Sequence, residues 1–399
     1  MIPYGRQSIS DEDIAAVVAV LRGDFLTQGP IVEQFEKRFA ARVGAQHAIA
    51  VNSATAALHL ALRVAGVGVG DRVVTSPITF LASANCAAYV GATPDFSDID
   101  PVTYTIDPVA LEIEWKPDTR AVVAVDYAGQ ACDLPEIARI ARAHGAVVIE
   151  EACHGVGGAF HAGSSQDRFK IGGHPWADLT VFSFHPVKTM TTGEGGMLVT
   201  DRADWAALAR TLRSHGIVRD PAQFATASDD PVLGEKGPWF YEMQELGWNY
   251  RLTDLQCALG LAQLGRLDAF LSRRREIVAA YNAAFASLEW MTTPGLRDER
   301  DEATTSWHLY TAQIDFVALG RTRAQVMAEL REAGIGTQVL YIPVHLQPWY
   351  RDTFGYGPGK CPIAEAFYAR TLSLPLYPAM TEADLTHVVA AVRRLSLSP

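Results

Sequence analysis

The lysine at position 188 has the surroundings of a reactive amine rather than those of a surface side chain. It follows an apolar segment, 179–184, that predicts a buried strand, and it lies within the stretch FHPVKTMTTGEGG at 184–196. Removal from water lowers the pKa of a lysine amine. The uncharged amine is then a nucleophile that can form a Schiff base. The nearby glycines permit tight turns that bring the backbone close to a ligand. Because a single lysine is most often a solvated surface group, this interpretation depends on the residues that accompany Lys188.

A turn of small residues after the apolar segment 48–51 predicts an anion site. Ser53, Ala54 and Thr55 open a segment, 54–64, that has a helical pattern. The free N–H groups at a helix start favour a phosphate group, and the two hydroxyls add further donors. The alternative is a plain helix cap made by Ser53.

Two further strand ends carry side chains that suit a flat, ring-shaped ligand. Phe80 follows the segment 72–75, and its ring is able to stack on a planar cofactor, although packing in the core is the ordinary alternative. Glu150 and Glu151 end the apolar segment that begins at Ala146. Buried carboxylates need a partner, and a protonated pyridine nitrogen is a suitable one. The alternative is a carboxylate that caps the next turn.

These features all follow predicted strands, and together they describe a pocket for pyridoxal phosphate (PLP). Along the chain there follow, in this order, a turn that can bind phosphate, an aromatic ring that can stack on the cofactor, a carboxylate for the ring nitrogen and an amine for the aldehyde. In layered α/β folds, ligands bind beyond the carboxyl ends of the strands. We therefore predict PLP as the cofactor and Lys188 as the residue that binds its aldehyde.

Nearly the whole chain resembles the sugar aminotransferases of the DegT/DnrJ/EryC1/StrS family. The resemblance includes the Lys188 stretch and the turn at 53–55. Other matching segments are FLTQGP at 25–30, DYAGQ at 126–130, LGWNYRLTD at 246–254, SWHLY at 306–310 and LSLPLYP at 372–378. The resemblance implies fold type I of the PLP-dependent transferases, which is the fold of aspartate aminotransferase, and a PLP-dependent transaminase activity on a nucleotide sugar.

The resemblance also implies roles for individual residues. Lys188 and Glu151 are the catalytic pair, with Glu151 on the ring nitrogen. The other implied cofactor contacts are Ser53, Ala54, Thr55 and Ser183 on the phosphate, Phe80 on the ring face, His154 beside the ring, and Asn249 on the phosphate of a neighbouring subunit. The implied substrate contacts are Thr27, Gln130, Tyr250, Arg251 and His345, with Trp349 near the last. The role of Asn249 implies a homodimer with shared active sites. For His345 and Trp349, the alternative is packing within a loop of the smaller domain.

One position departs from the family pattern. Aspartate is usual where Glu151 stands, and glutamate is one methylene longer, so either the backbone or the site geometry must adjust. Glu150 is the other candidate for the ring nitrogen. Strand alternation points neighbouring side chains to opposite faces, so only one of the two can face the pocket. We assign the role to Glu151.

Within the family, the likeness is greatest to the aminotransferases of the pseudaminic acid pathway. It rests on IPY at 2–4, SPITFLASANC at 76–86 and the Lys188 stretch. The implied reaction moves the amino group of L-glutamate to C4 of UDP-2-acetamido-2,6-dideoxy-β-L-arabino-hexos-4-ulose, giving UDP-4-amino-4,6-dideoxy-N-acetyl-β-L-altrosamine. One alternative is another nucleotide-linked keto sugar. Two others are a PLP-dependent sugar dehydratase, in whose branch histidine replaces the lysine, and a non-catalytic PLP-binding sensor.

The apolar segments predict an α/β protein with two domains. Strands that alternate with helices indicate a mainly parallel, seven-stranded sheet in a large domain, 1–253, followed by a smaller α+β domain, 254–399. The predicted strands are 48–51, 72–75, 94–97, 121–125, 146–150, 179–184 and 197–200, and predicted helices include 54–64 and 134–143. A long helix from about 254 to 288, opened by a capping box of Thr253 and Gln256, is expected to link the domains. A last helix is predicted near 382–395.

The composition disfavours several other classes of protein. The net charge is −11, with 34 Lys and Arg against 45 Asp and Glu, and no basic stripe for a nucleic acid is evident. No apolar stretch approaches the ~18 residues of a spanning helix, so no membrane partner is expected. The 5 cysteines are scattered and form no C-x-x-C pair, which argues against a disulfide framework and a zinc site. We expect no metal site and a cytoplasmic location.

Overall fold

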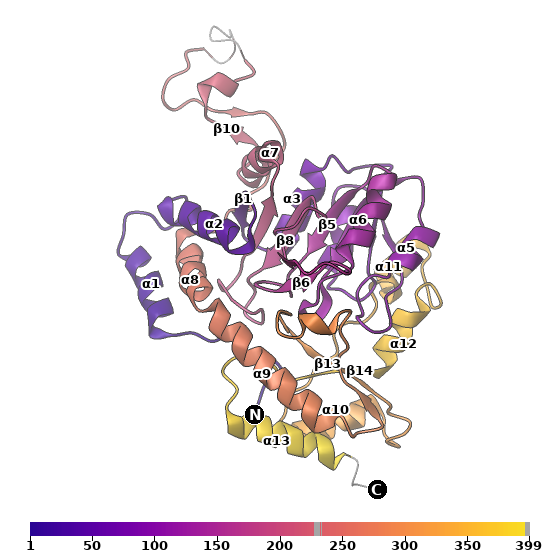
Figure 1. Ribbon diagram of the computed structural model, residues 1–399. Helices are drawn as coiled ribbons and strands as arrows, with labels where there is room; N and C mark the ends of the chain where they lie inside the picture. The colour runs from indigo at the N-terminus through magenta and orange to yellow at the C-terminus, as the bar shows by residue number, and fades with distance from the viewer. Residues whose placement is uncertain (227–231, 233, 396–399) are drawn as a thin grey trace.

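The structure, a computed structural model, describes residues 1–226, 232 and 234–395, and its largest feature is a seven-stranded sheet (Figure 1). The strand order is β1-β9-β8-β5-β4-β2-β3. These strands are β1 (His47–Val51), β2 (Arg72–Thr75), β3 (Thr93–Phe96), β4 (Thr119–Val125), β5 (Val147–Glu151), β8 (Leu179–Ser183) and β9 (Gly196–Thr200). Only β9 runs antiparallel to its neighbours in this sheet. The seven predicted strands and the mainly parallel sheet are therefore confirmed.

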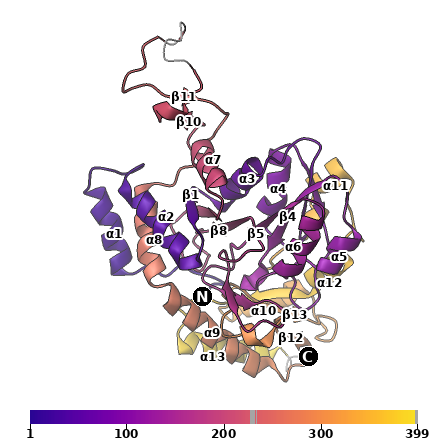
Figure 2. The same cartoon turned by 45° about the horizontal axis from the view of Figure 1, so that its top comes forward.

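Helices cover both faces of the sheet, because strand side chains alternate between two apolar layers (Figure 2). In β5, Val148 packs in one layer and Ile149 in the other, and Phe182 and Val181 of β8 divide in the same way. One layer contains α2 (Pro30–Val43) and α6 (Leu134–Ala143), and the other contains α3 (Ala54–Val64), α4 (Ala82–Tyr89) and α7 (Ala203–Arg213). Strands buried on both faces explain the apolar runs in the sequence. The helices predicted at 54–64 and 134–143 have these bounds.

The last third of the chain forms a second, smaller sheet with its own apolar core. Its antiparallel strands are β12 (Met291–Thr292), β13 (Tyr310–Ile314) and β14 (Thr371–Leu374), and its helices include α10 (Arg323–Glu332) and α13 (Glu382–Arg394). Other helices and strands are α1 (Asp11–Leu21), α5 (Pro108–Ile113), β6 (Ala159–His161), β7 (Arg168–Lys170), α11 (Pro348–Phe354) and α12 (Pro362–Arg370). The domain boundary at 253/254 stays a prediction.

The predicted long helix after Thr253 is two helices. They are α8 (Asp254–Gly265) and α9 (Leu267–Phe285), and Arg266 ends the first and precedes the second. The capping box of Thr253 and Gln256 is present. Gly265 weakens helix continuity, and the Arg266 guanidinium pairs at 2.7 Å with the buried carboxylate of Asp13 on α1. The prediction of one uninterrupted helix was therefore wrong at this position.

An arm between α7 and α8 projects away from the sheet where it is described (Figures 1 and 2). It carries the short strands β10 (Ile217–Val218) and β11 (Glu242–Met243) and the exposed side chains of Trp239, Tyr241 and Leu246.

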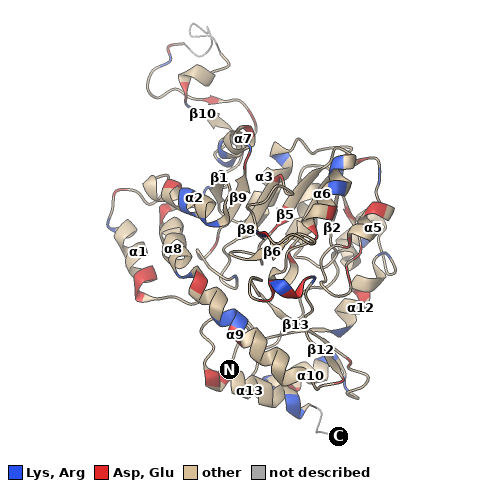
Figure 3. Cartoon of the chain, in the orientation of Figure 1, with Lys and Arg blue, Asp and Glu red and all other residues tan. Residues whose placement is uncertain are grey.

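Lysine and arginine positions are interspersed with aspartate and glutamate positions along the chain (Figure 3). Among the described residues, no helix combines the length and apolarity needed to cross a bilayer.

Candidate active site

A cavity of about 430 Å³ opens at the carboxyl ends of β4, β5 and β8. Val125, Glu151 and Ser183, the last residues of these three adjacent strands, all line it. Its further lining includes Tyr4, Ser53, Ala54, Thr55, Thr79, Phe80, Ser83, Cys153, His154, His185, Lys188 and Tyr341. The cavity therefore lies where a layered α/β fold ordinarily holds its ligand.

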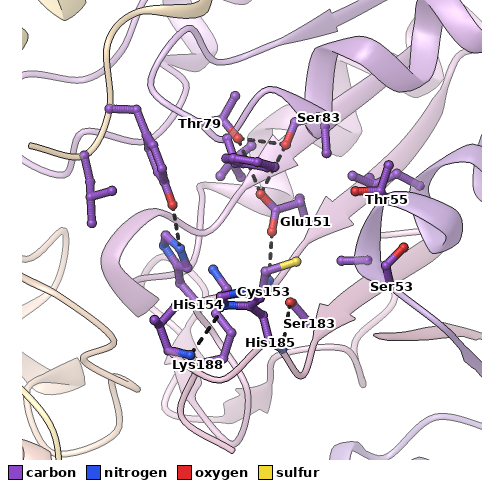
Figure 4. A pocket seen from close by; sticks show the side chains of 18 of the residues that line it. Ser53, Thr55, Thr79, Ser83, Glu151, Cys153, His154, Ser183, His185 and Lys188 are labelled. Atoms are coloured by element: carbon purple, nitrogen blue, oxygen red, sulfur yellow. Dashed lines mark hydrogen bonds between the residues drawn. The ribbon is translucent and has the colours of Figure 1, made fainter. Parts of the chain in front are cut away.

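Lys188 enters the cavity from the turn that follows β8. Its backbone N–H donates to the carbonyl of His185 at 2.9 Å, which fixes the turn. Burial lowers the pKa of the Lys188 amine, while nearby Cys153 and Glu151 act in the opposite direction. Within the described part of the chain, no hydrogen bond or ion pair engages this amine. Lys188 is therefore a buried amine of lowered pKa in the cavity, and its role as nucleophile and base stays a prediction (Figure 4).

The start of α3 faces the cavity through the turn of Ser53, Ala54 and Thr55, called here the Ser53 turn. Ser53 caps the helix, because its hydroxyl accepts a hydrogen bond from the N–H of Ala56 at 3.1 Å. The turn also lies against β9. A Cβ on Gly196 would stand 2.6 Å from the Ala54 nitrogen. The cap and the anion-site interpretations of Ser53 are therefore compatible, and α3 presents its positive end to the cavity.

The two adjacent glutamates point to opposite faces of the sheet. Glu151 lines the cavity, where its Oε1 accepts from the Cys153 N–H at 2.9 Å and its Oε2 from the Ser83 hydroxyl at 3.2 Å. Glu150 is fully buried on the other face and accepts from the Thr180 hydroxyl at 2.8 Å. The predicted alternation is confirmed, so Glu151 is the carboxylate of the cavity.

Aromatic side chains form one side of the cavity. Phe80 is 58% exposed and lies with its ring centroid 6.4 Å from that of Tyr341, so the core alternative for Phe80 is wrong. The Nδ1 of His154 accepts from the Ala128 N–H at 3.2 Å, and its Nε2 lies 3.4 Å from the Tyr341 hydroxyl. Burial lowers the pKa of His154 well below its ordinary value. His154 is therefore neutral, with its proton on Nε2.

Two residues predicted on the substrate side are engaged elsewhere. The Gln130 amide donates to the carbonyl of Gly295 at 3.1 Å and accepts from the Arg297 N–H at 2.6 Å, outside the Lys188 cavity. His345 is fully buried, and its Nε2 lies 3.0 Å from the Glu365 carboxylate. Neither side chain lines the Lys188 cavity of its own chain, because each ties its own loop to a neighbouring segment, and the two substrate contacts stay predictions.

The other predicted substrate residues, and the predicted cofactor contact Asn249, also lie outside the Lys188 cavity of the same chain. Thr27 and Asn249 are exposed, and the Tyr250 hydroxyl lies 3.0 Å from Nδ1 of His59. Arg251 lines a separate cavity of about 300 Å³. Trp349 is half exposed and packs on Tyr350 and Phe354. For Asn249, exposure agrees with the predicted contact to a neighbouring subunit, which stays a prediction.

Sequence reasoning did not identify Tyr4, Thr79, Ser83, Cys153 and Tyr341 as cavity residues. Thr79 and Ser83 flank Phe80 in a motif that the family resemblance had marked, so their spacing of four offered a signal. Tyr341 meets His154 across 187 positions of sequence, and no local pattern predicts such a contact.

Comparisons with known proteins agree with this geometry. A sequence model of the DegT/DnrJ/EryC1/StrS aminotransferase family matches residues 7–393. The chain is 44% identical to the spore coat polysaccharide biosynthesis protein SpsC of Bacillus subtilis, covering 98% of this chain and 96% of that protein. Among solved structures it is similar to Helicobacter pylori PseC, an aminotransferase involved in the biosynthesis of pseudoaminic acid, with a TM-score of 0.87, 28% identity and 100% of both chains covered.

A second solved structure bears on the cofactor. Spr1654 of Streptococcus pneumoniae has been solved in a PMP form, with a TM-score of 0.86, 28% identity and coverage of 100% of this chain and 99% of that one. Its PLP form has a TM-score of 0.86 at 27% identity, covering 99% and 98%. These likenesses span the large sheet and the smaller one together, so they confirm the predicted fold of the PLP-dependent aminotransferases over the whole chain.

Proposed function

Because the chain belongs to the DegT/DnrJ/EryC1/StrS aminotransferase family and is a sugar aminotransferase, we propose that it moves the amino group of L-glutamate to C4 of a UDP-linked 4-keto-6-deoxy-N-acetylhexosamine. One observation carries this proposal. An amine, a carboxylate and a helix start, from Lys188, Glu151 and the Ser53 turn, converge on one cavity of about 430 Å³. These are the groups that a phosphorylated pyridine aldehyde requires.

The cofactor is PLP, and the cavity residues fit it. The start of α3 and the Ser183 hydroxyl offer donors to its phosphate. The Glu151 carboxylate makes no ion pair among the described residues, which leaves it available to a protonated ring nitrogen. Phe80 offers a ring face for stacking. When bound, PLP supplies an aldehyde for the Lys188 amine and an electron-withdrawing ring.

Lys188 is suited to move protons because burial lowers its pKa. We expect its amine to take the proton from the α-carbon of L-glutamate in the first half-reaction. In the second half-reaction, the same amine delivers a proton to C4 of the sugar. Glu151 keeps the ring nitrogen protonated throughout, and His154 adds no charge to the cavity because it is neutral.

Two observations support the pseudaminic acid pathway as the source of the sugar. The chain shares its whole fold with PseC, and the motifs at 2–4 and 76–86 resemble that branch. Tyr4, Thr79, Phe80 and Ser83 from these motifs line the cavity. The product of this proposal is UDP-4-amino-4,6-dideoxy-N-acetyl-β-L-altrosamine. The likeness to SpsC favours, as the second candidate, another nucleotide-linked keto sugar of a surface polysaccharide.

We also propose a homodimer with shared active sites. Asn249 is exposed and lies outside the Lys188 cavity of its own chain. It follows the projecting arm, which carries Trp239 and Leu246 with 66% and 70% of their surface exposed. Large exposed apolar side chains at such a site favour burial against a partner. The five free cysteines support a reducing, cytoplasmic location for this dimer.

The first experiment follows the absorbance of the PLP-loaded protein before and after L-glutamate is added, without any sugar. We expect the yellow colour to be lost while 2-oxoglutarate is released in proportion to the protein. Lys188→Ala is the matched control, and it should release no 2-oxoglutarate. An unchanged spectrum with the natural chain would contradict the proposal and would indicate a sensor or a different donor.

The second stage adds candidate keto sugars to the glutamate-treated protein. The proposal expects return of the yellow colour and an amino sugar only with the UDP-linked 4-keto-6-deoxy-N-acetylhexosamine. Formation of a deoxy sugar without a new amino group would show a dehydratase instead. Turnover of a different keto sugar would retain the aminotransferase and overturn the pathway assignment.

A further inference from the structure

The Glu151 carboxylate is held by three protein groups before any ligand is considered. Its Oε1 accepts from the Cys153 N–H at 2.9 Å, and its Oε2 accepts from the Ser83 hydroxyl at 3.2 Å (Figure 4). The Thr79 hydroxyl lies 3.5 Å from the same Oε2 and 2.7 Å from the Ser83 oxygen. All of these side chains are buried. A buried charged group with such partners has a restricted orientation.

The distances favour one direction for the hydrogen bonds among these groups. An ionised carboxylate only accepts, and the Ser83 hydroxyl, at 3.2 Å from Oε2, is better placed to donate to it than the Thr79 hydroxyl at 3.5 Å. In the short contact between the two hydroxyls, Thr79 is then the donor and Ser83 the acceptor. The result is a one-way chain from Thr79 through Ser83 to Glu151.

Local structure explains why the two hydroxyls stand together. Thr79 precedes α4 and Ser83 lies in the first turn of that helix, four residues later. The turn before α4 brings the Thr79 hydroxyl to 2.7 Å from the Ser83 hydroxyl. β2, which leads to Thr79, is separated from β5 only by β4. The loop after β2 therefore reaches over the end of β5, where Glu151 stands.

We propose that Thr79 and Ser83 are positioning residues that hold the Glu151 side chain against the ring nitrogen of the cofactor. The inference rests on the proposed function for the identity of that ring. A glutamate side chain has three rotatable bonds, and fixing them costs conformational entropy. The Ser83 hydroxyl and the Cys153 N–H restrict these bonds through groups of the protein itself, so the carboxylate loses little further freedom when the ring binds.

The test measures the dissociation constant of PLP from the full-length protein, with no donor or sugar present. We expect Ser83→Ala to weaken PLP binding about tenfold, in keeping with the loss of a hydrogen bond to a charged group. Thr79→Val should weaken it a few-fold, since it removes the donor to Ser83. Ser83→Thr, which keeps a hydroxyl, should bind PLP as the natural chain does.

Thr75→Val is the matched control, because Thr75 is also a buried threonine and its hydroxyl donates to the Val123 carbonyl, away from Glu151. It should change PLP binding by less than about twofold. If Ser83→Ala and Thr75→Val behave alike, the positioning role is overturned. Ser83→Ala should also shift the pH at which the absorbance of the bound cofactor changes, and Thr75→Val should not.

A double substitution shows whether Ser83 acts through Glu151. In the Glu151→Gln background, Ser83→Ala should have little further effect on PLP binding, because the charged acceptor is already gone. Independent, multiplicative losses would overturn the inference. These measurements need no turnover. If the natural chain binds PLP but does not react with L-glutamate, the proposed function is contradicted, and the positioning role of Thr79 and Ser83 is still tested by PLP binding.

Discussion

Glu150 and Glu151 are consecutive residues with opposite surroundings. Glu151 lines the cavity, and its carboxylate accepts from the Cys153 N–H and the Ser83 hydroxyl. Glu150 is enclosed by the Thr180 hydroxyl, the Gly172 N–H at 3.1 Å and Nε2 of His174 at 3.1 Å. The His174 side chain lowers the pKa of Glu150, although burial acts against it. At the residue scale, two identical side chains therefore differ in position: Glu151 lines the cavity, and Glu150 is enclosed by protein groups.

The substitutions Glu151→Gln and Glu150→Gln should therefore differ in kind. Glu151→Gln removes the charge that supports the ring nitrogen, and we expect turnover to fall about a hundredfold or more. Glu150→Gln should keep turnover within a few-fold but lower the free energy of unfolding by about 1–3 kcal/mol, because a buried hydrogen-bonded group loses partners. Steady-state rates and urea unfolding measure the two effects. Equal loss of turnover in both variants would contradict the assignment.

The sequence predicts the residues of the cavity best where they follow strands. Lys188, Glu151, Phe80 and Ser183 all lie at or just after strand ends, and strand ends can be predicted from apolar runs. For His345, the motif does not reveal that the ring turns inward to Glu365. Contacts between distant segments depend on how the two sheets pack, which no local pattern encodes.

At the scale of helices and strands, the start of α8 caps the start of α2. α2 begins at Pro30 after Gly29, which has no side chain to cap it. The buried carboxylate of Asp254, the first residue of α8, accepts instead from the N–H groups of Gly29 at 2.8 Å and Ile31 at 3.0 Å. The neighbouring loop that contains Thr27 is thereby tied to α8.

Replacing Asp254 with alanine should leave two N–H groups of this helix start without a partner. We expect a loss of about 2–4 kcal/mol in the free energy of unfolding, measured by urea denaturation. Asp268→Ala is the control, because Asp268 is exposed and pairs with Arg42 at the surface, where an ion pair contributes about 0–1 kcal/mol. Similar losses in both variants would show that Asp254 does not cap α2.

The strands of the large sheet could be predicted because they are buried on both faces. The antiparallel direction of β9 and the break between α8 and α9 could not, because both depend on packing. Arg266 shows this well. Its pairing with Asp13 joins α8 to α1 across more than 250 positions, which the helical pattern around 266 does not reveal.

At the scale of the whole molecule, the dimer proposal means that the Lys188 cavity of one chain is completed by a residue of its partner. The arm projects from the sheet, and Asn249 stands outside the cavity that holds Lys188. If the arm packs against a partner, each cavity combines a lysine from one chain with an asparagine from the other. The activity of a dimer is therefore expected to depend on which of its two chains carries each substitution.

Heterodimers with two affinity tags test this arrangement. A dimer of one Lys188→Ala chain and one Asn249→Ala chain should have about half the activity of the natural dimer, since one of its two sites is intact. A dimer of one natural chain and one chain with both substitutions should be nearly inactive. The reverse pair of results would show that each site belongs to a single chain.

The close approach of Gly196 to the Ser53 turn limits how this sequence can change over time. Any side chain at 196 would meet the backbone of Ser53 and Ala54 at under 3 Å, so no substitution is conservative there. Gly265, by contrast, has open space around the position of its missing Cβ. We expect descendants of this sequence to vary at 265 and to keep glycine at 196, so that the shape of the Ser53 turn is inherited through a residue that is not part of the cavity lining.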